Sequence, residues 1–389
     1  MIPHSVTFTG GRFFDGTRLH DGKAARFRDG VFAGLISEAE LDAEDKVITL
    51  EGGILSPGYV DLQVNGGDGV MFNDDPSVAT LKRIASAHRK LGALTILPTL
   101  ITDTHEKTTA AIDAARSAIR AQVPGIAGLH LEGPHLSVAR KGAHDAALIR
   151  PMEEDDLQQL LAAKRDIPVL KVTIAPENVS TDQVATLTAS GILVSLGHTD
   201  AGFETCATYA RAGARCVTHL FNAMSQLGNR EPGLVGAALA TGALSAGLIA
   251  DGIHVHPAAM RMAWNSKMAP GRIFLVSDAM AVAGTEHTEF LLEGRRICRE
   301  NGRLTLEDGT LAGADLDLTS AIRVLVSDVG VDLDAALQAA TTTPGALIDH
   351  PTAPTPGKTT LADLIHISPC LHHLTLLEDV TAQSLSIAG

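Results

Sequence analysis

The segment Gly58–Leu100, GYVDLQVNGGDGVMFNDDPSVATLKRIASAHRKLGALTILPTL, begins and ends with short apolar runs. Such runs are typical of buried parallel strands. Between them, apolar residues recur at spacings of three, four and seven, at Leu81, Ile84, Ala85, His88 and Leu91. This period predicts a helix that buries one face, begins after Asp75-Pro76 and ends at Gly92. The segment therefore predicts one strand–helix–strand unit of a parallel sheet.

The same alternation continues along the chain to about Met280. Apolar runs end near eight positions: Asn65, Thr99, Glu132, Ala175, His198, His219, His254 and Asp278. Eight strands with intervening helices fit a closed (β/α)8 barrel, the TIM barrel of the α/β class. We therefore predict that residues 57–350 form such a barrel.

The two ends of the chain have a different pattern. Short β-type runs separated by Gly-Gly and Asp-Gly turns make up residues 1–56, and alternation returns in the last 30 or so residues. Because neither end is long enough to bury a core alone, we predict that 1–56 and 351–389 together form one small β-sandwich. Turns at Asn301-Gly302 and Asp308-Gly309 predict a β-meander after Asp278, followed by helices near 317–329 and 333–348.

Composition narrows the classes of partner. The 389 residues carry 31 basic and 45 acidic side chains, a formal net charge of −14, which argues against a nucleic-acid or anionic-membrane partner. The four cysteines contain no Cys-x-x-Cys pair and indicate reduced thiols. The N-terminus lacks a basic region followed by an apolar stretch, and the long uncharged run at 232–250 is only weakly hydrophobic. We therefore expect a cytoplasmic protein without a membrane span.

Polar residues that end apolar runs are the candidates for chemistry, because reactive side chains of a (β/α)8 barrel gather at the carboxyl ends of its strands. A single histidine there is more often structural. Glu132, His198 and His219 together, however, form the His₂Glu ligand set of a catalytic zinc site. Asp278, from a fourth strand end, suits a general acid/base, with a helix N-cap as the alternative.

The first predicted strand carries Gln63 and Asn65 on one face. Metal-dependent barrel hydrolases often have two histidines there, which bind a second metal. Neutral amides are poor ligands for such ions, so we predict one divalent metal per chain, with the amides left for hydrogen bonding. Zn²⁺ fits the ligand set best, with Fe²⁺, Co²⁺ or Mn²⁺ as alternatives. His130, on the strand face of Glu132, is either a core histidine or a group that orients a ligand.

Several motifs in one order resemble those of the N-acetylglucosamine-6-phosphate deacetylases of the amidohydrolase superfamily, from about Gly53 to Asp363. They are PGYVDLQVNG (57–66), HLEGP (130–134) with KGAH (141–144), SLGHT (195–199), THLFNAM (218–224), GNREPG (228–233), DGIH (251–254) and VSDAM (276–280).

This resemblance implies a hydrolase that converts N-acetylglucosamine 6-phosphate to glucosamine 6-phosphate and acetate. It implies that Glu132, His198 and His219 bind the metal, that Asp278 is the acid/base and that His144 helps to polarise the acetyl carbonyl. The expected substrate-binding positions are Gln63, Asn65, Ala143, Asn222, Ala223, Arg230, His254, Leu311, Ala312 and Gly313. Arg230 is expected to reach the phosphate across a homodimer interface, and the loop at Leu311–Gly313 to close over the sugar.

One position departs from the family pattern. His135 stands where an aromatic residue often follows Glu-Gly-Pro, which affects the expected packing around the acetyl group, and we do not expect it to bind metal. Two alternatives remain at this point. One is an amidohydrolase for another N-acyl sugar or a cyclic amide, since fold and metal set do not fix the substrate. The other is a non-enzymatic barrel, against which the intact Glu132, His198, His219 and Asp278 argue.

Overall fold

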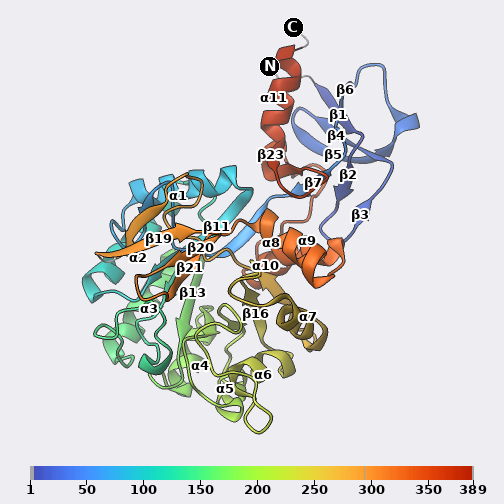
Figure 1. Cartoon of the computed structure of the whole chain (residues 1–389). Helices are drawn as coiled ribbons and strands as arrows, with labels where there is room; N and C mark the ends of the chain where they lie inside the picture. The colour runs from blue at the N-terminus through green and yellow to red at the C-terminus, as the bar shows by residue number, and fades with distance from the viewer. Residues whose placement is uncertain (1–3, 293, 388–389) are drawn as a thin grey trace.

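Eight parallel strands form the central sheet of the computed structural model, which describes residues 4–292 and 294–387 (Figure 1). Residues 1–3, 293 and 388–389, which include the outer ends of both predicted sandwich segments, lie outside this description. The strands are neighbours in chain order: β8 (Tyr59–Val64), β11 (Ala93–Ile101), β12 (Gly128–Glu132), β13 (Val169–Ile174), β14 (Leu193–Leu196), β15 (Cys216–Val217), β16 (Ser245–Leu248) and β17 (Ile273–Leu275).

The sheet closes where the segment after β17 meets β8. Val64 and Ala279 form a parallel bridge, and the Asn65 N–H donates to the Ala279 carbonyl at 2.9 Å. The buried Asp61 carboxylate accepts the Ser277 N–H at 3.2 and 3.3 Å, which fastens the two sides of the seam. Burial raises the pKa of Asp61 to about 7. The predicted barrel is confirmed.

One predicted strand end was wrong. β16 ends at Leu248 instead of near His254. The reason is a turn centred on Asp251, whose carboxylate accepts the N–H groups of Ile253 and His254, both at 2.8 Å. Such side-chain acceptors compete with a strand ladder, so the chain leaves the sheet before His254.

Helices cover the outside of the barrel (Figure 1). The predicted first helix is α1, which begins after Ser77, whose hydroxyl accepts the Thr80 N–H, and ends before Gly92 at φ +83°. The helices are α1 (Val78–Lys90), α2 (His105–Arg120), α3 (Glu154–Asp166), α4 (Thr181–Ala189), α5 (Phe203–Arg211), α6 (Gly233–Ala240), α7 (Pro257–Ser266), α8 (Leu318–Val324) continued by the π-helix η3 (Leu325–Val329), α9 (Leu333–Ala340) and α10 (Thr342–Leu347). The short 3-10 helices are η1 (Glu38–Glu40), η2 (Val138–Arg140) and η4 (Leu361–Asp363).

Both chain ends build one sandwich, as predicted. One sheet has the order β5-β4-β1-β6 and the other β23-β22-β7-β2-β3, so C-terminal strands pair directly with N-terminal ones. The core between the sheets contains Phe8, Phe13, Phe27 and Leu364. The strands are β1 (Ser5–Thr9), β2 (Arg12–Phe14), β3 (Leu19–His20), β4 (Lys23–Arg28), β5 (Val31–Ser37), β6 (Lys46–Thr49), β7 (Ile54–Pro57), β22 (Leu364–Ile367) and β23 (Leu374–Leu376).

The end of the chain differs from the expected β alternation. Residues Leu377–Ile387 form the helix α11 beside the sandwich (Figure 1). Leu377 is buried in the sandwich core and Val380 packs against it. This spacing of three places both side chains on one helical face, so packing on the sandwich favours the helix.

The predicted meander is present as four antiparallel strands: β18 (Glu289–Leu292), β19 (Arg295–Glu300), β20 (Arg303–Thr305) and β21 (Leu311–Ala314). A buried cluster joins Leu292 and Ala312 of this sheet to Met71, Ile101 and Met280 of the barrel. Met71 belongs to β10 (Val70–Met71), which pairs with β9 (Gly66–Gly67). Among the described residues, none of the helices combines the length and apolar character that crossing a membrane requires.

Candidate active site

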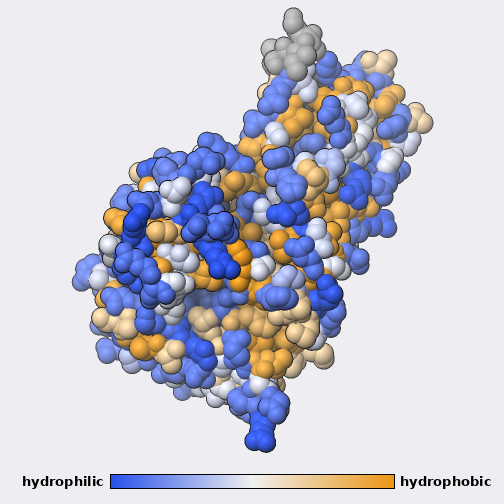
Figure 2. Space-filling model, in the orientation of Figure 1, coloured by the Kyte–Doolittle hydropathy of each residue, from blue (hydrophilic) through white to orange (hydrophobic). Residues whose placement is uncertain are grey.

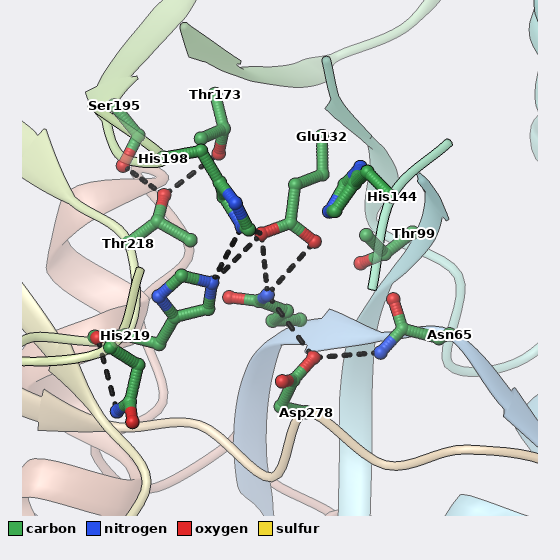
Figure 3. Close-up of polar contacts among 12 residues, drawn as sticks. Asn65, Thr99, Glu132, His144, Thr173, Ser195, His198, Thr218, His219 and Asp278 are labelled. Carbon is green, nitrogen blue, oxygen red and sulfur yellow. Dashed lines mark hydrogen bonds and ion pairs between the residues drawn. The ribbon is translucent and has the colours of Figure 1, made fainter. Parts of the chain in front are cut away.

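Three side chains from different strand ends converge at the mouth of the barrel (Figure 3). Glu132 Oε1 lies 3.2 Å from His198 Nε2 and 3.1 Å from His219 Nε2, and the two Nε2 atoms are 3.1 Å apart. All three residues are buried. Burial alone would raise the pKa of Glu132, but its contacts with the imidazoles of His198 and His219 hold this pKa well below its usual range.

The spacing of these three atoms fits a metal ion. Zinc bonds to imidazole nitrogen and carboxylate oxygen are about 2.0–2.2 Å long, so two such ligands in a tetrahedral site lie about 3.3 Å apart. The observed separations of 3.1 and 3.2 Å are close to this value. His198 Nδ1 also lies 2.9 Å from the Arg140 carbonyl, to which it donates, so Nε2 is left as the ligand atom.

Two histidines of the cluster and Asp278 have an unusual backbone conformation. His198, His219 and Asp278 have φ of +47°, +31° and +51°, the left-handed region that non-glycine residues rarely adopt. Each such residue costs about 1–3 kcal/mol and persists only where its surroundings enforce it. The left-handed turns follow directly after the strands, at the carboxyl rim of the barrel.

Two amides connect the carboxylates of the site. Gln63 Nε2 donates to both oxygens of Glu132 at 3.1 Å and to Asp278 Oδ1 at 3.2 Å. Asn65 Nδ2 donates to the same Asp278 oxygen at 2.7 Å. Burial and the charge of Glu132 raise the pKa of Asp278; a divalent cation in the site would act in the opposite direction. The two amides therefore hold the carboxylates in place.

His144 has a defined tautomer. Its Nδ1 accepts the Thr102 N–H at 3.3 Å and lies 2.8 Å from the Thr102 hydroxyl. Burial lowers the pKa of His144 to about 3, which leaves the ring neutral. A neutral ring that accepts at Nδ1 carries its proton on Nε2, so His144 offers one N–H donor.

A cavity of about 170 Å³ contains these groups. All predicted site residues line it except two, Gln63 and Arg230. Gln63 lies behind the lining, where it contacts Glu132 and Asp278. The lining residues are Asn65, Ile101, Glu132, Gly142, Ala143, His144, His198, His219, Asn222, Ala223, Ile249, His254, Asp278, Met280, Leu292, Leu311, Ala312 and Gly313.

A histidine and an outer-sheet strand form part of the cavity wall. His254 Nδ1 lies 2.6 Å from Asp251 Oδ2, which leaves Nε2 for the cavity. Leu311–Gly313, expected as a loop, is part of the strand β21, because it pairs with β20. The Ala314 N–H also donates to the Asp278 carbonyl at 2.9 Å, which attaches this strand to the barrel. At Gly313, with φ +66°, a Cβ would come within 2.4 Å of the Met280 side chain, so this approach requires glycine.

Arg230 lies outside the cavity of its own chain. The loop before α6 projects from the barrel in Figure 1 and forms a hydrophilic protrusion in Figure 2. The Glu231 carboxylate accepts the N–H groups of Phe203 at 2.7 Å and Gly233 at 2.9 Å. It thereby ties the base of the loop to the first turns of α5 and α6, while Arg230 stays exposed.

His135 was not expected to bind metal, and it is not part of the Glu132–His198–His219 cluster: its Nδ1 lies 3.1 Å from the Arg150 carbonyl. Other residues of the site were missed in the sequence. Thr102, which orients His144, was not predicted, because a threonine after an apolar run is also an ordinary β-strand residue. Ile249 and Met280, which also line the cavity, were missed because an apolar residue in the sequence does not indicate a binding site.

The chain is similar in sequence and in structure to known proteins. The amidohydrolase family model matches residues 54–348. The N-acetylgalactosamine-6-phosphate deacetylase of Shewanella sp. (strain ANA-3) is 44% identical over 84% of this chain and 83% of its own. The N-acetylglucosamine-6-phosphate deacetylase of Haemophilus influenzae is 34% identical over 79% and 80%. The crystal structure of the N-acetylglucosamine-6-phosphate deacetylase from Pasteurella multocida aligns with a TM-score of 0.89 at 29% identity, over 96% and 98%.

Proposed function

The chain belongs to the amidohydrolase family, and on that basis we propose that it is a metal-dependent hydrolase that removes acetate from N-acetylglucosamine 6-phosphate. One observation carries the proposal. Glu132, His198 and His219 converge as a three-ligand cluster in one cavity with Asp278. Relatives that cover about four fifths of the chain are named as amino-sugar-phosphate deacetylases.

The donor set suits a divalent cation, with Zn²⁺ as the best match. Such an ion would lower the pKa of a water molecule and polarise an amide carbonyl. Around it, the His144 Nε2–H is the donor for the negative charge that develops on the acetyl oxygen, since a fixed donor in a buried site stabilises this charge strongly. Asp278 accepts the proton of the attacking water and returns it to the sugar nitrogen, which leaves as an amine.

The phosphate needs positive partners in an acidic protein. His254, hydrogen-bonded to Asp251, lines the cavity. Arg230 is exposed on the loop that Glu231 fastens, next to Leu227, which is 59% exposed. We propose that this loop belongs to a homodimer interface and that Arg230 enters the cavity of the partner, where it pairs with the phosphate.

N-acetylgalactosamine 6-phosphate is the second candidate substrate. It differs only at the C4 hydroxyl, and the relative with 44% identity is named for it. The metal cluster, Asp278 and His144 act on the acetamide, so their roles are the same for both sugars.

Acetate release from four sugars tests the proposal: both N-acetylhexosamines, each with and without the 6-phosphate. A charged hydrogen bond contributes about 1.5–3 kcal/mol, so loss of contacts to Arg230 and His254 is expected to lower kcat/KM about 10²-fold or more. The ratio between the two phosphorylated epimers identifies the sugar. Equal kcat/KM with and without the phosphate would contradict the proposed substrate class.

A further inference from the structure

Five buried side chains below the metal cluster form an unbroken line of hydrogen bonds across neighbouring barrel strands, and we call them the hydroxyl belt: Thr99, His130, Thr173, Thr218 and Ser195. His130 Nδ1 lies 3.1 Å from the Thr99 hydroxyl, and its Nε2 lies 2.8 Å from the Thr173 hydroxyl. Thr173 and Thr218 are 2.7 Å apart, as are Thr218 and Ser195. None is more than 1% exposed.

The protons of the belt have one consistent order. The Thr99 hydroxyl donates to the Leu97 carbonyl, so it accepts from His130 Nδ1. With the ring neutral in this buried position, Nε2 accepts from Thr173. Thr173 then accepts from Thr218, which in turn accepts from Ser195. Every hydroxyl of the belt has a donor or acceptor on each side except Ser195 at its end.

The belt lies directly beneath the metal-binding side chains. His130 is two residues before Glu132 on the same strand, Ser195 is three before His198, and Thr218 precedes His219. Figure 3 shows Thr173, Ser195 and Thr218 grouped beside His198, above His219 in this view. The strands β12, β14 and β15, which lead to the three ligands, are thus connected by side chains in addition to their backbone ladders.

The packing around the belt is tight. A Cβ on Gly197, the residue before His198, would lie 2.9 Å from both Thr173 Cγ2 and Thr218 Cβ. Glycine at this position lets the backbone that leads to His198 rest on the contact between the two threonines. The left-handed residues His198 and His219 both follow immediately after this contact.

We propose that the hydroxyl belt sets the spacing of the three metal-binding side chains, with Thr218 as the positioning residue at its centre. The proposal rests on the metal site of the proposed function. None of the belt residues lines the cavity, so the proposal does not involve contact with substrate. Groups hydrogen-bonded directly to metal ligands commonly change metal affinity 10- to 100-fold. The belt acts on the three side chains through the backbone that leads to them, so we expect an effect near the lower end of this range, and affinity is the property to measure.

The test is Thr218→Val, which keeps the shape of the side chain but removes its hydrogen bonds to Thr173 and Ser195. We expect the dissociation constant for Zn²⁺, from competition with a chromophoric chelator, to rise about tenfold, the lower end of the range for direct partners of metal ligands. We also expect the visible spectrum of the Co²⁺-loaded variant to change. Thr218→Ser keeps the hydroxyl and is expected to stay within about threefold of wild type. Ser195→Ala removes only the terminal donor and is expected to have a smaller effect than Thr218→Val.

A purely structural role would lower the stability of the metal-free variant but leave the Co²⁺ spectrum and the Zn²⁺ affinity of its folded fraction unchanged, and that result would overturn the proposal. If Thr218→Val does not fold, Thr173→Val interrupts the belt one strand away and is judged by the same two readouts. These measurements use metal alone, so their outcome does not depend on which substrate the protein hydrolyses. Failure of the proposed function appears instead as normal metal binding without acetate release.

Discussion

Asp278→Asn is expected to lower kcat/KM for deacetylation at least 10²- to 10⁴-fold while the metal stays bound, because general acid/base groups contribute about this range. The carboxylate lies in the cavity beside the ligand cluster and accepts hydrogen bonds from Gln63 and Asn65. An Asn side chain retains an oxygen for these donors but cannot take a proton from water. The test is to measure kcat/KM for deacetylation and the metal content per chain in the same sample.

A surface substitution of the same type provides the control. Asp113→Asn changes an exposed carboxylate on α2, which pairs with Arg116, and is expected to leave kcat/KM unchanged. Near-normal turnover in Asp278→Asn would show that another residue is the base. Loss of metal from the variant would instead assign Asp278 a role in holding the ion.

A one-to-one mixture of Arg230→Ala and Asp278→Asn chains, reassembled into dimers, is expected to regain about a quarter of wild-type activity, although each variant alone is nearly inactive. If Arg230 serves the partner, one site of a mixed dimer has both defects and the other has neither. With random pairing, half of the dimers are mixed and half of their sites are intact. Co-refolding the two purified variants and measuring acetate release gives the result.

The sample must be shown to contain mixed dimers, for example by a different affinity tag on each variant. Activity that remains at the level of the separate variants would then mean that Arg230 acts in its own chain or in no site. The exposed position of Arg230 and the fastening of its loop by Glu231 are the structural basis of this prediction.

The barrel and the ligand cluster could be predicted because each element repeats a simple pattern. A short apolar run followed by Glu132, His198 or His219 places a polar side chain at the carboxyl rim, and the closed sheet brings the rims together. No residue-to-residue contact was needed for that inference. The sandwich followed from the same kind of argument, since two short β-rich ends cannot bury separate cores.

Features that depend on contacts between distant residues were not predictable. Thr99 lies opposite His130 only because of the register between β11 and β12. Along the sequence, the belt threonines are indistinguishable from ordinary strand residues. The end of β16 depends on the turn that Asp251 makes, and α11 depends on the sandwich surface against which Leu377 and Val380 pack. Such contacts exist only in the folded chain.

Titration of the metal-free protein with Zn²⁺, followed by the release of acetate and free amine from N-acetylhexosamine 6-phosphate, tests the central claim most directly. Gln63 and Asn65 direct their N–H groups at Glu132 and Asp278, and amides in these positions do not supply the ligands of a second ion. We predict that release rises in proportion to the metal, with equal amounts of acetate and amine, and reaches its maximum at one equivalent per chain. A maximum at two equivalents, or full activity in the presence of a chelator that has removed the metal, would contradict the account.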